Sequence, residues 1–313
     1  MSTTAFVFPG QGSQSVGMLG ELASNYPLIV ELFSTVSDDL GYDLWEMVQH
    51  GPDSLLNQTE HTQVAMLVSD VAVYKVLQQQ GVVRASMMAG HSLGEYAALV
   101  CADAIGLRDA AVLVGTRGRL MQETVPSGQG AMAAVIGLTD NDVVALCKEV
   151  TTTSQQVMPA NYNAIGQVVI AGHTMAVEKA IERAIEMGAR MAKIIPVSVP
   201  CHCSLLTEAA EKFSESLLKA DFKIPTLPVI SNVDLSVYQS ALQIRTLLKE
   251  QLYRPVRWVE TIQTMKNKGV EVVVECGPGK VLSGLIKRID KSLTAMSVYD
   301  QSSLESALVS VQK

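Results

Sequence analysis

The residues best suited to chemistry in this chain form the segment Gly90-His91-Ser92-Leu93-Gly94, which has the pattern Gly-x-Ser-x-Gly. A short apolar run precedes it and a helix-like run follows it, which is the strand–turn–helix context of a nucleophile elbow. Such a turn holds a serine hydroxyl clear of the backbone near a helix N-terminus, and the glycines keep the turn free of crowding Cβ atoms. We therefore predict that Ser92 is a nucleophile. The alternative is a glycine-flanked serine that caps an ordinary helix.

A serine hydroxyl needs a base to take its proton, and an imidazole suits that role near neutral pH. Of the five histidines we favour His202, because it follows Pro200 where the chain is expected to return to the larger unit of the fold. His91 adjoins the serine, but neighbouring side chains of an elbow point apart, so we expect it to be structural. No acidic residue between Ser92 and His202 stands out as a triad member, so a backbone carbonyl is the alternative partner for the ring.

A tetrahedral acyl-transfer intermediate also needs hydrogen-bond donors for its oxyanion. We expect the backbone N–H of Leu93 on the elbow to supply one, and Gln11, in the Gly10-Gln11-Gly12 turn after the first strand, to supply the other. Arg117 lies in an apolar helix among small residues, where it is either a surface side chain or a buried clamp for an anion. A guanidinium binds a carboxylate through two parallel charge-assisted hydrogen bonds, which lysine cannot reproduce.

The elements that must position these groups alternate between strands and helices. Before the middle of the chain we predict a strand at 4–8 and helices at 18–25, 28–40, 63–80 and 108–124, with the elbow between the last two. After the middle we predict a helix at 204–219, a strand at 227–231, helices at 244–252 and 259–267, a strand at 270–275 and a last helix from Val281. This alternation predicts an α/β fold with a mostly parallel sheet covered on both faces.

The middle of the chain has a different pattern. Its predicted elements are a strand (131–136), a helix (139–149), two strands (157–162 and 167–171), a helix (175–187) and a strand (192–197). The order β-α-β-β-α-β is that of a ferredoxin-like unit. We therefore predict two subdomains: a large catalytic one made of residues 1–127 and 198–313, and a small ferredoxin-like one inserted at residues 128–197.

Composition excludes several other classes of function. A formal net charge of -7 argues against a nucleic-acid partner, and the longest apolar runs are too short for a membrane helix. Five cysteines, an odd number, argue for a reducing compartment, and the start of the chain lacks the basic segment of a signal peptide, so we expect a cytoplasmic protein. Cys201 and Cys203 flank His202 without a second ligand pair, so we expect no metal. The turn at Gly10 lacks the third glycine of a dinucleotide motif, and we expect no cofactor.

Longer motifs occur in one order along nearly the whole chain and resemble those of the malonyl-CoA:acyl carrier protein transacylases. They are Phe8-Pro9-Gly10-Gln11-Gly12-Ser13-Gln14, Gly90-His91-Ser92-Leu93-Gly94-Glu95-Tyr96, Arg117-Gly118, residues 128–137, Val197-Ser198-Val199-Pro200 with His202, residues 251–255 and residues 275–280. The resemblance implies an α/β-hydrolase-like large subdomain with a ferredoxin-like small one, in agreement with the pattern of elements.

The resemblance also implies roles for individual residues. Ser92 would be the nucleophile, His202 would be the general acid/base, and the backbone carbonyl of Gln251 would orient His202. Gln11 and Leu93 would form the oxyanion hole, and Arg117 would bind the malonyl carboxylate. The substrate pocket would be lined by His91, Asn161 and Cys201. Cys201 stands where bacterial members usually have serine, which leaves its effect on substrate selectivity open.

The implied reaction is ping-pong. Ser92 attacks the thioester of malonyl-CoA, and the phosphopantetheine thiol of acyl carrier protein then takes the malonyl group for fatty acid elongation. Malonyl-CoA is a substrate rather than a cofactor, and we expect a monomer. The acidic carrier protein would dock on a basic patch on and beside the last helix (Lys280, Lys287, Arg288 and Lys291), with Arg190 and Lys193 next, unless these side chains form only a solvated helix face. The alternatives are a serine hydrolase or thioesterase on the same elbow and a transacylase for a branched acyl unit.

Overall fold

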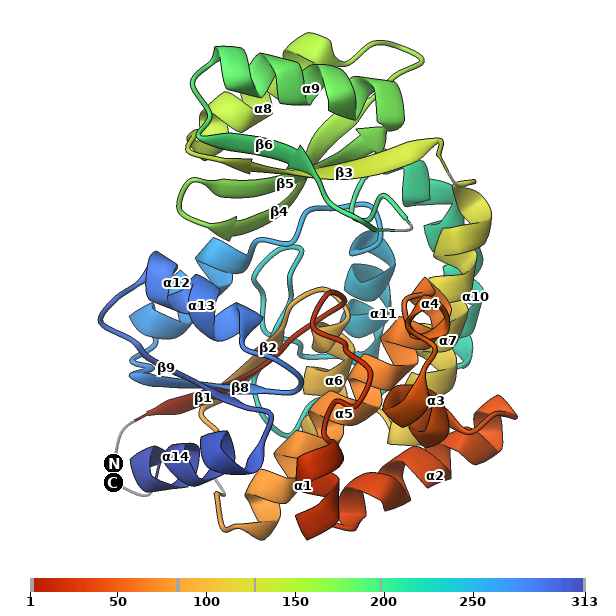
Figure 1. Cartoon of the computed structure of the whole chain (residues 1–313), viewed down its shortest axis with the longest axis vertical. Coiled ribbons are helices and arrows are strands. Elements are labelled where there is room, and N and C mark those ends of the chain that lie inside the picture. Colours follow the sequence, from red (N-terminus) through yellow and green to blue (C-terminus); the bar gives the residue numbers. More distant parts are fainter. Residues whose placement is uncertain (1–2, 83–84, 127, 198, 312–313) are drawn as a thin grey trace.

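Two separate β-sheets organise the chain (Figure 1). The structure, a computed structural model, describes residues 3–82, 85–126, 128–197 and 199–311. The first sheet has the strand order β7 (Val229–Ile230), β2 (Met87–Gly90), β1 (Thr4–Phe8), β8 (Val272–Cys276) and β9 (Thr294–Val298). All of its neighbouring strands are parallel, as the alternation of strands and helices predicts.

The register of the central strands brings two loops together. Phe8, the last residue of β1, pairs with Gly90, the last residue of β2. Because both strands end at the same edge of a parallel sheet, the turn after β1 lies beside the elbow after β2. The carboxyl edge of such a sheet is where α/β proteins place their ligands.

Helices cover both faces of this sheet. They are α1 (Gly20–Asn25), α2 (Leu28–Leu40), α3 (Leu44–His50), α4 (Asp53–Leu56), α5 (Thr59–Gln79), α6 (Gly94–Cys101), α7 (Leu107–Thr124), α10 (Thr207–Lys219), α11 (Ala241–Glu250), α12 (Trp258–Asn267), α13 (Val281–Ile289) and α14 (Gln301–Val311). Phe6 and Phe8 of β1 point into the core with α5, α6 and α7, whereas Ala5 and Val7 point into the core with α12 and α13. The strand is buried on both faces for this reason, which explains its uninterrupted apolar sequence.

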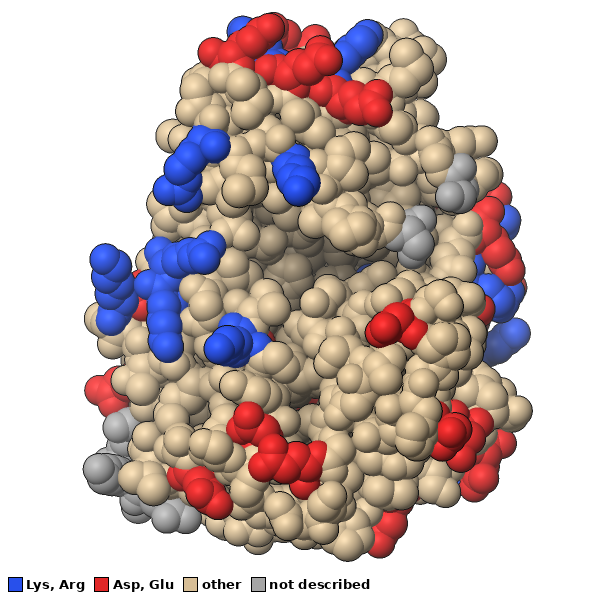
Figure 2. Space-filling view, viewed as in Figure 1, with Lys and Arg blue, Asp and Glu red and all other residues tan. Residues whose placement is uncertain are grey.

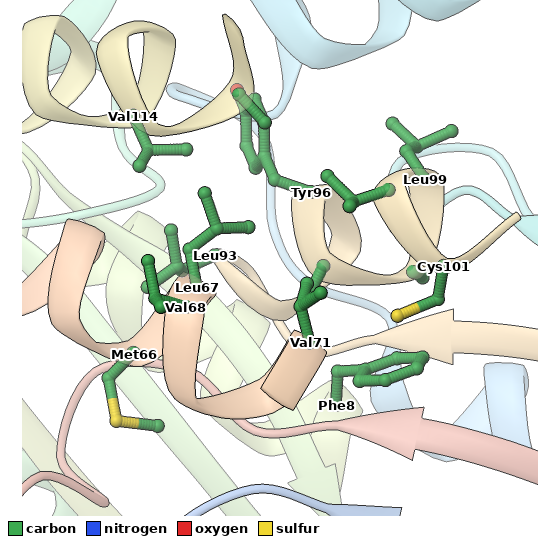
Figure 3. Close-up of a cluster of buried hydrophobic side chains, with 14 of the residues drawn as sticks. Phe8, Met66, Leu67, Val68, Val71, Leu93, Tyr96, Leu99, Cys101 and Val114 are labelled. Carbon is green, nitrogen blue, oxygen red and sulfur yellow. The ribbon is translucent and has the colours of Figure 1, made fainter. Parts of the chain in front are cut away.

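The elbow is anchored in the larger of these cores. Figure 3 shows the side chains of Leu93 and Tyr96 packed with Val71 of α5, Phe8 of β1 and Val114 of α7. Leu93 and Tyr96 are 1% and 0% exposed. The backbone around the predicted nucleophile is therefore held by close packing on its inner side.

The second sheet is antiparallel and has the order β4 (Val157–Ala164), β5 (Gln167–His173), β3 (Gly130–Ile136) and β6 (Met191–Ile194). With α8 (Asp140–Val150) after β3 and α9 (Thr174–Glu186) after β5, the chain follows the predicted β-α-β-β-α-β order, and the predicted fold class is confirmed. Thr139 and Asp142 form a capping box that starts α8. The helices cover one face of the sheet, and the other face turns toward the large sheet (Figure 1).

The end of the chain differs from the prediction. The helix that begins at Val281 is not the last element, because β9 and α14 follow it. The short helices α3 and α4 and the 3-10 turn Ser204–Leu206 before α10 were also not predicted as separate elements. The predicted boundaries of the two subdomains fall at residues 127 and 198, which lie outside the described residues. Within the described part of the chain, no helix combines the length and the apolar character needed to cross a membrane.

Candidate active site

Ser92 sits on a tight turn between β2 and α6, as predicted. Its φ is 52°, in the left-handed region that residues other than glycine rarely adopt. A Cβ on Gly94 would overlap the backbone carbonyl of Phe8, and one on Gly90 would overlap the backbone of Gly94 itself. Gly10 lies equally close, since its Cβ would come within 2.6 Å of the His91 carbonyl oxygen. The glycines thus allow β1, the elbow and the turn after β1 to meet.

Ser92 and His202 are brought into direct contact. The Ser92 Oγ lies 2.7 Å from His202 Nε2, and the other ring nitrogen, Nδ1, lies 2.7 Å from the backbone carbonyl oxygen of Gln251. A carbonyl oxygen only accepts, so Nδ1 carries the proton and Nε2 accepts from the serine hydroxyl. The predicted backbone partner of the ring is present at the predicted residue.

The protonation state of His202 follows from its surroundings. The residue is 2% exposed, and burial lowers its pKa to about 3, with the positive charge of Arg117 acting in the same direction. The Gln251 carbonyl opposes this shift because it accepts from the ring. The imidazole is therefore neutral near pH 7 and available as a base.

Arg117 is buried rather than at the surface, which decides between the two alternatives that its sequence context leaves open. Only 1% of it is exposed. Its Nη1 donates to Gln63 Oε1 at 2.9 Å, and its Nη2 donates to Gln251 Oε1 at 2.9 Å and approaches Ser92 Oγ at 3.4 Å. None of the arginine ion pairs among the described residues involves Arg117. A buried guanidinium beside the serine is suited to receive an anionic group of a ligand.

A pocket opens above these groups, between the two sheets. The side of the large sheet contributes Pro9, Gly10, Gln11, Gly12, Ser13, His91, Ser92, Leu93, Arg117, Cys201, His202, Val281, Leu282 and Leu285 to its lining. The small sheet and the segment after it contribute Met132, Asn161, Asn163, Val169, Ile195 and Val197. Figure 2 shows the surface hollowed between the two parts of the molecule. Gln11 and Leu93, the predicted oxyanion-hole residues, thus share the pocket with the serine.

The other predicted lining residues also lie in this pocket. The ring of His91 packs edge-on against Trp258, and its Nε2 lies 2.7 Å from Asn163 Oδ1, which holds it away from the serine hydroxyl. Asn161 is 6% exposed. Burial raises the pKa of the Cys201 thiol to about 11, so it is protonated near neutral pH and weakly nucleophilic.

Gln251 does more than the resemblance implies. Its backbone carbonyl accepts from His202, while its side chain accepts from Arg117 and donates from Nε2 to the Ser92 carbonyl oxygen at 3.0 Å. It therefore contacts the predicted nucleophile, base and anion ligand at once. Such a role depends on where α11 ends relative to the elbow, which no local pattern in the sequence reveals.

Four further residues of the site escaped the sequence analysis. They are Gln63, Glu95, Asn232 and Tyr238, all buried. Glu95 had the clearest available signal, since it follows the serine by three positions in a run of otherwise apolar residues. A triad carboxylate would contact the His202 ring, whereas the ring contacts the Gln251 carbonyl and Glu95 lies elsewhere.

The chain has extensive similarity to known proteins. A family model described as the acyl transferase domain matches residues 5–304. The malonyl CoA-acyl carrier protein transacylase of Escherichia coli strain K12 is 51% identical over 308 residues, which cover 98% of this chain and 99% of that protein. The solved structure of the malonyl CoA-acyl carrier protein transacylase from Coxiella burnetii has a TM-score of 0.98 and 46% identity, covering 100% of this chain and 98% of that one. A malonyl-transacylase solved in complex with a type II PKS acyl-carrier protein has a TM-score of 0.97 and 49% identity, covering 99% and 100%.

Proposed function

Because the chain belongs to the malonyl-CoA:acyl carrier protein transacylases of the acyl transferase domain family, we propose that it transfers malonyl groups from malonyl-CoA to acyl carrier protein for fatty acid synthesis. The observation that carries the proposal is the burial of Arg117 directly beside the Ser92–His202 hydrogen bond. The Ser92–His202 pair alone would support the transfer of many different acyl groups. The guanidinium adds a requirement for an acyl group that ends in a carboxylate.

In the first half-reaction, Ser92 Oγ attacks the thioester carbonyl of malonyl-CoA while its proton passes to His202 Nε2. The carbonyl oxygen becomes an oxyanion and accepts from the N–H groups of Leu93 and Gln11. Collapse of the intermediate breaks the carbon–sulfur bond, and His202 returns the proton to the departing sulfur of coenzyme A. The product is malonyl-Ser92.

In the second half-reaction, the phosphopantetheine thiol of acyl carrier protein gives its proton to His202 and its sulfur attacks the malonyl-serine ester. The same donors hold the oxyanion. Collapse breaks the ester bond, and the proton passes from His202 to the Ser92 oxygen. The enzyme is regenerated, and the malonyl group leaves as a thioester of the carrier protein.

Arg117 supplies the selectivity in this proposal. Its Nη2 lies 3.4 Å from Ser92 Oγ, so the guanidinium is within reach of a carboxylate at the end of a short acyl group on that oxygen. An acetyl group has no carboxylate, so it would leave the guanidinium unpaired in a closed pocket. Malonyl transfer therefore proceeds faster than acetyl transfer from the same site.

We assign the small sheet and its two helices, residues 128–197, to a separate subdomain that closes the pocket from above. Met132 and Val169 of this sheet line the pocket. Among the described residues the two sheets have no strand in common, and an isolated bridge joins Asn161 of β4 to Val256. These apolar residues limit the access of water to the malonyl ester. That shielding favours transfer to a thiol over hydrolysis.

Basic side chains flank the mouth of the pocket, and we assign them to docking of the acidic carrier protein. Leu282 and Leu285 of α13 line the pocket, and the exposed residues on and beside that helix include four basic ones, Lys280, Lys287, Arg288 and Lys291. Lys193 in β6 and Arg190 just before it are also exposed, and Arg190 lines a second hollow together with Arg288. Figure 2 shows the positive side chains gathered on this side of the molecule, whereas negative ones dominate the face below and the far top. Local complementarity of this kind steers association despite the overall acidic charge.

Charge reversal tests this docking surface. In the double variant with Lys287→Glu and Arg288→Glu, we expect the KM for carrier protein to rise while malonylation by malonyl-CoA is unchanged. Lys219→Glu, an exposed reversal on α10, is the matched control. If the double variant and the control have the same carrier-protein KM, the docking surface lies elsewhere.

We also propose that the protein acts as a monomer in the cytoplasm. All five cysteines are free, which suits a reducing compartment. The pocket has its nucleophile, base and anion ligand from a single chain. Both features are compatible with the soluble, single-chain enzyme that the proposed reaction needs.

Intact mass spectrometry tests the proposed function. After mixing with malonyl-CoA, we expect the wild-type protein and Ser214→Ala, a control serine on α10, to gain one malonyl group, and Ser92→Ala to gain none. Addition of phosphopantetheinylated carrier protein should then remove the malonyl group and place it on the carrier. Release of free malonate without the carrier would instead identify a thioesterase.

A further inference from the structure

Glu95 is a buried carboxylate that the reaction described above does not use. It lies in the first turn of α6, three residues after the nucleophile, and is 0% exposed. It is not one of the described residues that line the pocket. It therefore touches no substrate, and any effect on the reaction must act through its neighbours.

Three hydrogen-bond donors converge on this carboxylate. The Tyr238 hydroxyl donates to Oε1 at 2.5 Å, and Gln251 Nε2 donates to Oε2 at 2.5 Å. The backbone N–H of Asn232 lies 3.3 Å from Oε1 and 3.4 Å from Oε2. All three partners donate, and an ionised carboxylate, which only accepts, is the group that satisfies them.

Two of these partners contact the reacting machinery directly. Asn232 Oδ1 accepts from the Ser92 backbone N–H at 2.8 Å, and Asn232 Nδ2 donates to the Gly90 carbonyl oxygen at 2.7 Å. Asn232 therefore fixes the backbone of the elbow at two positions. Gln251 contacts Ser92, His202 and Arg117, as described above. Glu95 is thus one residue removed from the nucleophile, the base and the anion ligand.

The carboxylate also decides which way round the Gln251 amide lies. With Nε2 toward Glu95, Oε1 faces Arg117 and accepts from it at 2.9 Å. A flipped amide would place its oxygen against the carboxylate and its N–H groups against the guanidinium, two repulsive contacts. A negative charge at residue 95 therefore selects the amide orientation that holds Arg117.

The distribution of charge gives Glu95 a second effect. Arg117 is buried without an ion pair among the described residues, and Glu95 is the carboxylate joined to it through a single amide. This indirect link partly neutralises the guanidinium in the empty pocket but leaves its remaining N–H groups free for a ligand carboxylate. A carboxylate in direct contact with Arg117 would compete with the malonyl group instead.

On this basis we propose that Glu95 is a positioning residue and the indirect counter-ion of Arg117. It positions the elbow through Asn232, and it positions His202 and Arg117 through Gln251. The proposal rests on the malonyl transfer proposed above.

Burial raises the pKa of Glu95 to about 7, while its three donors and Arg117 act to lower the pKa. The titratable or charged groups facing it are Tyr238 from the loop after β7, Arg117 from α7 and Tyr96 of its own helix. The carboxylate therefore loses its charge as the pH falls through about 7.

Glu95→Gln, an isosteric change, tests the proposal in the first half-reaction alone, measured as the rate of malonyl-Ser92 formation by rapid quench and intact mass. We expect the maximal rate to fall roughly tenfold to a hundredfold because the serine and base are misplaced. The KM for malonyl-CoA should rise as well, because the Gln251 amide then no longer has a fixed orientation and Arg117 loses its acceptor. The wild-type rate should decline below pH 7, and this acid limb should be absent from the variant.

Two further variants keep the proposal testable if Glu95→Gln folds poorly. Tyr238→Phe removes one donor to the carboxylate without changing its charge, and it should shift the acid limb to higher pH. Leu146→Ala, in the core of the small subdomain, lowers stability at a site remote from the pocket and should leave both the rate and the pH profile unchanged.

The outcomes separate this proposal from the proposed function. If the wild type forms no malonyl-Ser92, malonyl transfer itself is wrong. If the wild type is acylated but Glu95→Gln shows the wild-type rate and acid limb, Glu95 has no positioning role. A lower rate together with an unchanged acid limb would mark Glu95 as merely structural, and would also overturn the proposal.

Discussion

Replacement of Arg117 by alanine is expected to remove the preference for malonyl-CoA over acetyl-CoA. The guanidinium is 1% exposed and its surroundings are closed, so a malonyl carboxylate in the variant pocket would be desolvated without a positive partner. Breaking a buried ion pair by removing one partner costs about 3–5 kcal/mol. At about 1.4 kcal/mol for each factor of ten, kcat/KM for malonyl-CoA should fall by roughly two to three and a half orders of magnitude.

The reactivity toward acetyl-CoA should change in a different way. In the wild type, an acetyl group leaves the guanidinium unpaired, and this disadvantage disappears with the side chain. Loss of Arg117 also leaves Gln63 Oε1 and Gln251 Oε1 without their donor, which slows both substrates by a common factor. The ratio of the two kcat/KM values cancels that factor, so the ratio is the quantity to measure.

The assay compares kcat/KM for acyl-enzyme formation from malonyl-CoA and from acetyl-CoA in each variant. Arg119→Ala is the matched control, because Arg119 lies two residues further along α7 and pairs at the surface with Glu123. Arg117→Lys keeps the charge without the two-pronged geometry and should fall between wild type and Arg117→Ala. An unchanged malonyl-to-acetyl ratio in Arg117→Ala would refute the assignment of the malonyl carboxylate to this guanidinium.

Three further outcomes are expected. Gly94→Ala should abolish activity and lower the melting temperature, because its Cβ would overlap the Phe8 carbonyl. Gly284→Ala on α13, where a Cβ meets nothing within 4 Å, should preserve activity and melting temperature in the same assays. In the unfolded state His202 has its usual pKa of about 6.5, whereas in the folded state its pKa is about 3. The neutral ring therefore contributes to the free energy of unfolding above pH 6.5, and this contribution is lost as the pH falls toward 3. Urea titrations between pH 7 and 4 should therefore give a shallower slope for His202→Gln than for wild type, and equal slopes would contradict the lowered pKa. Cys201→Ser should retain malonyl transfer within a few-fold, and a large loss of kcat/KM would show that the thiol has a specific role.

Much of the fold was predictable because its signals are local. The strand at 4–8 and the helix at 28–40 have the predicted bounds, since the first is a continuous apolar run and the second a regular amphipathic repeat. The β-α-β-β-α-β order in the middle of the chain was predictable in the same way, from its short strand-like and helix-like runs. The helix that begins at Val281 is present, but β9 after it was missed because it lies at the sheet edge, where only Ala295 and Val298 of its five residues are buried, and its sequence lacks a continuous apolar run.

The residues of the candidate site differ in the same way: a local sequence pattern indicates some of them, and only the fold brings the others together. Ser92 was identifiable because an elbow needs glycines at fixed spacing, and that need is satisfied within five consecutive residues. For His202, Arg117 and Gln251, position and family resemblance indicated roles, but nothing in the residues themselves showed that they meet. Glu95 was overlooked because its partners come from the end of α11 and the loop after β7, which only the folded chain brings together.

The sequence by itself determined the tight turn that carries Ser92 and the order of the elements, because these depend on backbone geometry and periodicity over a few residues. Only the tertiary structure decided that Arg117 is buried, that it donates a hydrogen bond to Gln251, and that Ser92 meets a histidine 110 positions away. Burial and pairing set the energy of a charge, and both are properties of the space around a residue rather than of its neighbours in the chain.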